Sequence, residues 1–186
     1  MAQNYFNPRT DLAVEEKERF TAGEEISGVL AEQWERGEGL RLTRVEIKNS
    51  QGAKAMGKPE GVYVTIEAEA LAQEDPSYHK EAAKELGRQL REMIDRCCPG
   101  KKYLSVFAAG LGNMQVTPDS LGPRVIENLQ MTRHLNLEYS PDFCRMKGLP
   151  VLSGMAPGVM GQTGMETAEI VKGAVMETRP DLIIAV

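Results

Sequence analysis

Asp119 is the residue of this sequence whose surroundings best suit chemistry. An apolar run from Tyr103 to Ala109 precedes it, and this run is short enough and rich enough in β-forming residues to predict a strand buried on both faces of a parallel sheet. A glycine-rich turn and the tripeptide Thr117-Pro118-Asp119 follow, before an apolar helical pattern begins near Gly122. In open α/β sheets, ligands bind in loops at the carboxyl ends of strands. Asp119 is therefore the first candidate catalytic residue.

Four further residues support this loop in the prediction: Gly110, Gly112, Asn113 and Thr117. The two glycines allow backbone conformations that other side chains forbid. Asn113 could orient Asp119 or polarise a scissile carbonyl. A plainer interpretation is also open, in which the turn is only tight and Asp119 caps the helix that follows by accepting a backbone N–H.

Other side chains give weaker signals for catalysis. His79 and His134 each stand alone, and a histidine near the end of a helix has a favourable electrostatic role without any catalytic task. None of the serines at 105, 120 and 153 lies in a G-x-S-x-G setting. The three cysteines are odd in number and show no C-x-x-C spacing, which favours free thiols over disulfides or a zinc site.

The bulk properties predict an ordinary α/β domain. The chain has 186 residues, 41% of them hydrophobic, which suffices for one good core. The net charge is −5 and the basic residues form no dense cluster, so neither nucleic acid nor an anionic membrane is expected as a partner. The N-terminus lacks the apolar stretch of a signal peptide, and we expect a cytoplasmic protein without a cofactor.

The first half of the chain predicts a helix, two strands and a second helix. Part of the stretch from Glu15 to Arg36 fits helical spacing. The stretches Leu40 to Ile47 and Val62 to Ala68 alternate apolar and polar residues, which predicts an antiparallel strand pair. Tyr78 to Cys97 is the clearest helix. Its expected buried face carries these residues: Ala82, Leu86, Leu90, Met93 and Ile94.

The second half predicts alternating strands and helices. The helix that starts near Gly122 is expected to end near His134, and the glycine-rich stretch 155–161 is expected to be a loop. The spacing Thr163-x-x-Glu166 predicts a capping box for a helix that runs to about Thr178. Residues 181–186, DLIIAV, read as a second buried strand, and we interpret a chain that stops there as a fragment.

Motifs spread over the whole chain resemble those of the germination protease family of spore-forming bacteria. They include RTDLAVE at 9–15, GKP at 57–59 with GVYVT at 61–65, GLGN at 110–113 and TPD at 117–119. They continue with LGP at 121–123, VIEN at 125–128, TRH at 132–134 and PGVMGQTGMET at 157–167. GLGN alone would be weak, but the ordered set is specific.

The resemblance implies a homotetrameric endopeptidase, made as a zymogen, that degrades small acid-soluble DNA-coating proteins of the spore core during germination. It implies a pair of catalytic aspartates and no metal, with Asp119 as one member; the other would follow the strand that matches DLIIAV. It also implies a propeptide of residues 1–11, cut between Asp11 and Leu12, and a peptidase domain from residue 12 to 186, truncated at its C-terminal end. Substrate-like residues at the tail could occupy the cleft until the cut.

The expected fold is a three-layer α/β/α arrangement with a mostly parallel central sheet, plus the antiparallel strand pair. The GLGN and D-x-x-G pattern is also similar to that of hydrogenase-maturation peptidases, which are guided by nickel, and such a peptidase is the alternative function. A binding module with a phosphate cradle is a further alternative, although the glycines do not fit G-x-G-x-x-G. The last alternative is a fragment without activity.

Overall fold

The computed structural model describes residues 27–186 except 38 and 74, and it divides the chain into two compact units. The first unit ends at Met93 and the second runs from Ile94 to Val186. The predicted propeptide and its cleavage site, Asp11 and Leu12, lie outside the described residues. No helix in the described part of the chain is long and apolar enough to cross a membrane.

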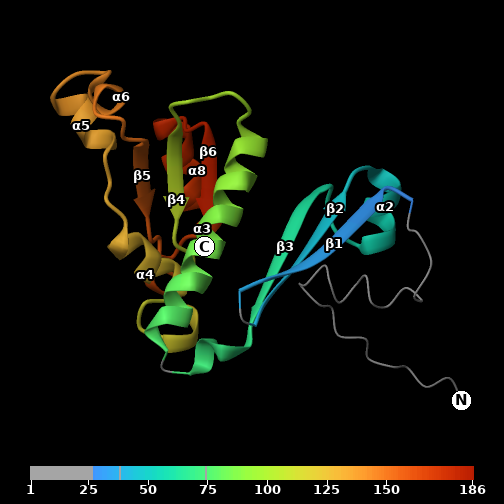
Figure 1. Cartoon of the computed structure of the whole chain (residues 1–186). Helices are drawn as coiled ribbons and strands as arrows, with labels where there is room; N and C mark the ends of the chain where they lie inside the picture. The colour runs from blue at the N-terminus through green and yellow to red at the C-terminus, as the bar shows by residue number, and fades with distance from the viewer. Residues whose placement is uncertain (1–26, 38, 74) are drawn as a thin grey trace, which may run out of the picture. The chain divides into compact units, whose positions relative to one another are not determined.

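The first unit contains an antiparallel sheet in the order β1-β2-β3 (Figure 1). Its strands are β1 (Val29–Arg36), β2 (Leu40–Ile47) and β3 (Gly61–Ala68). The predicted strand pair is confirmed, because β2 and β3 are hydrogen-bonded neighbours. Most of the stretch in which a helix was predicted, residues 15–26, lies outside the described residues, and a helix is wrong for residues 29–36, which form β1 instead. Strand pairing explains this difference: every residue of β1 lies opposite a residue of β2, and this tertiary partner outweighs a helical pattern broken by glycines.

A short helix, α2 (Ser50–Met56), lies between β2 and β3, where the sequence indicated only a glycine- and lysine-rich connection. The Asn49 side chain caps it by accepting the N–H groups of Gln51 and Gly52 at 3.1 and 3.0 Å. Helix α2 contributes Met56 to a core cluster with Val45 and Ile47 of β2, all at most 2% exposed. The apolar alternation of β2 therefore builds the core of this unit.

Helix α3 (Pro76–Cys97) confirms the predicted long helix, and it follows a short 3-10 helix, η1 (Glu69–Ala72). Asp75 caps α3 by accepting the N–H of Ser77 at 2.8 Å. The predicted buried face is only partly right, because Leu86 and Leu90 are 51% and 41% exposed. The buried positions are instead Tyr78, Ala82, Glu85 and Gln89. Glu85 tolerates burial because Arg88 and Gln89 hydrogen-bond to its carboxylate.

The second unit contains a parallel sheet in the order β5-β4-β6, with β4 in the middle (Figure 1). Strand β4 (Ser105–Ala109) is the buried central strand that the apolar run predicted. Its neighbours are β5 (Val151–Met155) and β6 (Leu182–Ala185). The prediction of a strand at 181–186 is confirmed, but its burial is not: Ile183 is 48% exposed. In the described chain β6 has a single neighbour, β4, so one of its edges is uncovered.

Helices connect these strands, and the connections cross the sheet in opposite directions. The chain passes from β4 to β5 through η2 (Thr117–Asp119), α4 (Leu121–Asn128), α5 (Arg133–Glu138) and α6 (Phe143–Met146). It returns across β4 to β6 through α7 (Met160–Thr163) and α8 (Thr167–Thr178). Helix α4 contacts β4 and β5, while α8 contacts β4. The unit is therefore a mixed α/β structure built on a parallel sheet.

The predicted helix from Gly122 to His134 is wrong in its extent, because it is broken between α4 and α5. Thr132 explains the break. Its N–H donates to Leu152 O at 2.9 Å, its hydroxyl donates to Pro150 O at 2.6 Å, and the same hydroxyl accepts the Leu152 N–H at 2.8 Å. These bonds to the start of β5 replace the bonds that a continuous helix would make. His134 therefore lies near the start of α5 and not at a helix end.

The predicted capping box at Thr163-x-x-Glu166 is also wrong, because it is displaced by one turn. Thr163 is the last residue of α7, which begins inside the stretch 155–161 that was expected to be a loop. Helix α8 starts at Thr167, and the Glu166 N–H donates to Glu169 Oε2 at 3.1 Å. Glu166 thus precedes the helix and Glu169 supplies the reaching carboxylate. The predicted helix end is confirmed by Arg179, which adopts a left-handed conformation after Thr178.

Candidate active-site loop

The loop that follows β4 is fastened to both neighbouring strands. The Gly110 N–H donates to Met155 O at the end of β5, at 3.0 Å. The Leu111 N–H donates to Val186 O, after the end of β6, at 2.7 Å. The first residues after β4 therefore lie beside the ends of both neighbouring strands. A loop held on both sides can place a side chain above the carboxyl edge of the sheet with little freedom.

Asp119 is exposed, and its carboxylate is held by the backbone of the same loop. The Asn113 N–H donates to Asp119 Oδ2 at 2.8 Å and to the Asp119 carbonyl oxygen at 3.0 Å. The Asp119 N–H in turn donates to Val116 O at 2.9 Å. Residues 113 to 119 therefore form a closed turn whose last member carries the carboxylate. No second donor reaches this carboxylate from the described residues.

This geometry is different from a helix cap. Ser120, not Asp119, is the residue directly before α4, and no side chain caps the helix there. The plainer interpretation of Asp119 as a helix cap is therefore wrong, because its carboxylate is engaged by Asn113. The Ser120 hydroxyl is buried and donates to Thr117 O at 2.9 Å. Thr117 thus contributes its carbonyl to the local structure beside Asp119.

Three glycines make the close approaches in this loop possible. A Cβ on Gly112, whose φ is +117°, would lie 2.1 Å from Asp119 O. A Cβ on Gly110 would lie 2.4 Å from Gly122 O. A Cβ on Gly122 would lie 2.4 Å from both Leu111 O and Val186 O. Because real Cβ atoms do not come so close, side chains at these positions would displace the loop from α4 and from the end of β6.

The structure thus brings together five of the seven predicted site residues: Asp119, Gly110, Gly112, Asn113 and Thr117. The sequence reasoning did not single out Gly122, which packs against Gly110, or Gln162, whose Nε2 lies 3.4 Å from Asn113 Oδ1. Both residues stand in the family motifs. Neither shows a spacing of its own that would have identified it, because the contacts join segments distant in sequence.

A second carboxylate of this unit, Asp181, lies at the opposite edge of the sheet, just before β6. The Lys101 ammonium hydrogen-bonds to Asp181 Oδ1 and the Ser105 N–H donates to Oδ2 at 2.9 Å. The hydrogen bond from Lys101 is the main cause that lowers the pKa of Asp181, and the bond from Ser105 adds to it. Asp181 therefore stays ionised as a structural ion pair that fastens the starts of β4 and β6.

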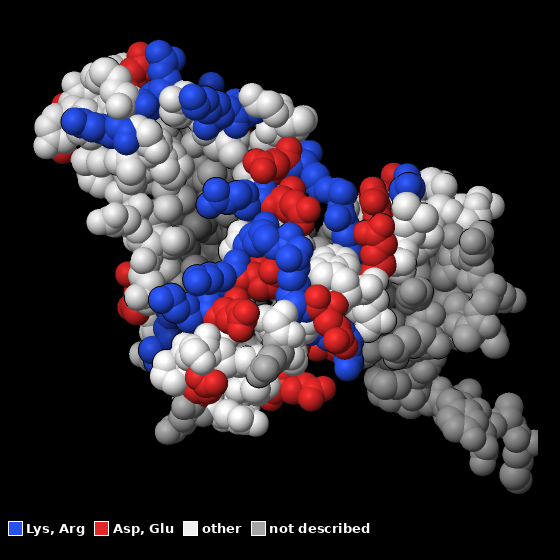
Figure 2. All heavy atoms as spheres, in the orientation of Figure 1, with Lys and Arg blue, Asp and Glu red and all other residues white. Residues whose placement is uncertain are grey.

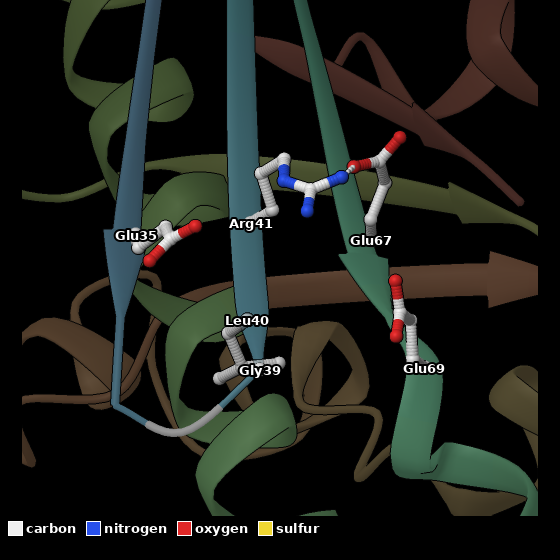
Figure 3. A pocket seen from close by; sticks show the side chains of 6 residues that line it. All are labelled: Glu35, Gly39, Leu40, Arg41, Glu67 and Glu69. Carbon is white, nitrogen blue, oxygen red and sulfur yellow. Dashed lines mark hydrogen bonds and ion pairs between the residues drawn. The ribbon is translucent and has the colours of Figure 1, made fainter.

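The first unit has a shallow pocket that also carries carboxylates. Glu35, Arg41 and Glu67 line it from three adjacent strands, with Gly39, Leu40 and Glu69 below (Figure 3). Arg41 Nη1 lies 3.1 Å from Glu67 Oε2 in an exposed ion pair. The Arg41 and Glu67 side chains are 46% and 42% exposed, so their charges are solvated, and the pocket contains none of the predicted site residues.

The remaining surface offers no stronger alternative among the described residues. On the face drawn in Figure 2, lysine and arginine side chains are interspersed with aspartate and glutamate. The described residues include no group of three or more His, Cys, Asp or Glu arranged to hold a metal ion. His79 is engaged with a backbone carbonyl, with Nε2 3.0 Å from Leu71 O. The three cysteines are free thiols, as expected.

The fold and the loop together define an α/β protein that presents a carboxylate at the carboxyl edge of a parallel sheet. A family model described as "Germination protease" matches residues 8–186. Curated germination proteases are similar over nearly the whole chain. The one from Caldanaerobacter subterraneus subsp. tengcongensis is 45% identical over 96% of this chain and 52% of its own length. Those of Clostridium perfringens and Bacillus subtilis are 40% and 36% identical, over 97% and 98% of this chain and 54% and 50% of their own lengths.

The chain belongs to the germination protease family. The resemblance stated from the motifs is confirmed by these relatives. The chain spans about half the length of the curated relatives it matches.

Proposed function

We propose that this chain carries part of an endopeptidase of spore germination, with Asp119 as one member of a pair of catalytic carboxylates. The observation that carries the proposal is the position of Asp119. The carboxylate is exposed, and it is held by a backbone N–H, in a loop that contacts the end of β6. The family's peptidase activity agrees with such a site, because peptide hydrolysis needs a base that activates water.

The second carboxylate would come from polypeptide that follows Val186. The contact between Leu111 N and Val186 O supports this, because it brings the end of β6 beside the Asp119 loop. Two carboxylates that share a site do not both ionise easily, so one keeps a proton while the other accepts one from water. One residue type then supplies both the acid and the base for hydrolysis of a peptide bond.

Further properties of the whole protein belong to the same proposal. The substrates are small acid-soluble spore proteins, the assembly is a homotetramer and the location is the spore core. Residues 1–11 are a propeptide that the enzyme removes by cutting between Asp11 and Leu12. The complete fold is a three-layer α/β/α structure similar to that of hydrogenase-maturation peptidases. The parallel sheet and its contacts with α4 and α8 agree with that arrangement.

Cleavage of a small acid-soluble spore protein tests the proposal. The 186-residue chain is compared with a polypeptide extended through the next strand and loop, each with and without Asp119→Asn. Only the extended wild type is expected to cut, and Asp119→Asn is expected to reduce its rate by about 10²- to 10⁴-fold. Cleavage by the extended Asp119→Asn variant at the wild-type rate would show that the catalytic group lies elsewhere.

Asp142→Asn is the matched control for that experiment. Asp142 lies before α6 in the same unit, is exposed, and pairs with Arg145 at 3.7 Å. The same chemical change there should leave the rate unaltered.

Self-processing is tested separately: mass spectrometry after incubation at mildly acid pH should show loss of the first 11 residues. An N-terminus that stays intact would contradict the zymogen proposal.

A further inference from the structure

A side-chain contact joins the loops that follow β4 and β5. These strands are parallel neighbours with Ala109 opposite Met155, so both loops leave the same edge of the sheet. Gln162, in α7, donates from Nε2 to Asn113 Oδ1 at 3.4 Å. The contact ties the connection after β5 to the loop that carries Asp119.

The Gln162 amide is oriented by its own surroundings. Its Oε1 accepts the Val159 N–H at 3.4 Å. An amide has an acceptor on one side and donors on the other, so this bond turns Nε2 toward Asn113. A Cβ on Gly158, whose φ is +76°, would lie 2.6 Å from Gln162 Oε1. The glycine thus leaves room for the amide in this position.

Asn113 connects this amide to the carboxylate. Its Oδ1 accepts from Gln162 Nε2 and also from the Gln115 N–H at 3.0 Å. Its backbone N–H donates to Asp119 Oδ2 at 2.8 Å. Fixing the Asn113 side chain therefore helps to fix the backbone group that aims the carboxylate.

We infer that Gln162 is a positioning residue for Asp119 and acts through Asn113. The inference rests on the proposed catalytic role of Asp119. Both hydrogen bonds of Gln162 are long, so they add little to the stability of the fold. Catalytic hydrogen bonds often tighten only when substrate is bound. The effect of Gln162 is therefore expected in turnover and not in unfolding.

The test uses the extended polypeptide and the variants Gln162→Ala and Gln162→Glu. The second variant keeps the shape of the side chain and replaces its donor by an oxygen. Both should lower kcat by about 10- to 100-fold with KM and Tm nearly unchanged, because a small misplacement of a reacting group costs this much. Amide hydrogen exchange at Asn113, which needs no substrate, should become faster in both variants.

Gln130→Glu is the control for the added charge. Gln130 is exposed, lies between α4 and α5 of the same unit and is not one of the hydrogen-bond partners of the Asn113 side chain, so the same substitution there keeps the amide of Gln162. It should retain kcat and the wild-type exchange rate at Asn113. The inference is overturned if Gln162→Ala leaves either kcat or the Asn113 exchange rate at the wild-type value. Failure of the proposed function is seen separately, as a wild type that does not cut or an Asp119→Asn variant that does.

Discussion

The antiparallel and parallel sheets hold their carboxylates in different ways. On the antiparallel sheet, Glu67 pairs with Arg41 across the strands, with both side chains more than 40% exposed. At the amino edge of the parallel sheet, Asp181 pairs with Lys101. At its carboxyl edge, the hydrogen-bond donor to the Asp119 carboxylate among the described residues is a backbone N–H, which orients the carboxylate and brings no opposite full charge. Among these three carboxylates, the two that pair with side-chain cations are structural, and the one oriented by a backbone N–H alone is the candidate for chemistry.

The largest expected effect comes from a methyl group in the Asp119 loop. Gly112→Ala should destabilise the second unit by about 3 kcal/mol or more, because its Cβ would meet Asp119 O in an already unfavourable φ region. Gly57→Ala, at the left-handed cap of α2 with nothing within 4 Å, should cost only about 1 kcal/mol. Urea denaturation of both variants measures the difference. Equal costs would mean that the tight approach to Asp119 contributes nothing.

Changing the length of an acidic side chain tests whether the orientation of its carboxylate matters. Asp119→Glu keeps the charge but cannot keep the 2.8 Å contact with Asn113 N, so cleavage by the extended polypeptide should fall about 100-fold. Glu67→Asp, the reverse change on the antiparallel sheet, should leave cleavage unchanged. Rates measured at saturating substrate decide this. An Asp119→Glu variant with the wild-type rate would show that cleavage does not need the hydrogen bond from the Asn113 N–H.

The Asp181 pair should show its role through pH. The folded-state pKa of Asp181 is lowered, first by the hydrogen bond from Lys101. Its stabilisation is therefore fully present above the unfolded pKa of about 3.9 and is lost as pH falls through the lower folded value. Asp181→Asn should cost about 1 kcal/mol at pH 7 and progressively less below about pH 4. A difference from wild type that stays constant between pH 7 and pH 3 would contradict the ion-pair role.

The smallest effect is expected on the antiparallel sheet. Arg41→Gln removes an ion pair whose partners are 46% and 42% exposed, so it should cost at most about 0.5 kcal/mol. Thermal unfolding in low and high salt measures it, and the small difference from wild type should vanish in high salt. A loss of several kcal/mol would place Arg41 among the residues that hold this sheet together.

The parts of the fold that were predictable from sequence are those where local pattern and tertiary partner agree. The buried run of β4, the alternation in β2 and β3, and the long helix α3 follow from periodicity. Strand β1 was not predictable, because its pairing with β2 overrides its spacing. The break after α4 depends on Thr132 bonding to β5, a contact that no local pattern encodes.

The residues of the candidate site can also be divided into those that were predictable from the sequence and those that were not. The position of Asp119 after a buried strand, and the glycines before it, could be recognised from the sequence as a motif. The roles of Gly122 and Gln162 were not, because they arise where separate loops meet. The exposed face of β6, with Ile183 48% exposed, shows the same limit: periodicity indicates a strand but not what covers it.

The bond between Leu111 N and Val186 O also has a consequence for the order of events during synthesis. It joins positions far apart in sequence, and such contacts carry a loop-closure cost that delays them in folding. The turn of residues 113 to 119 is closed by local hydrogen bonds, but the loop is anchored through Leu111 only after β6 has emerged and paired with β4. A chain still growing on the ribosome would already contain Asp119 but would lack Val186, whose carbonyl oxygen anchors the loop.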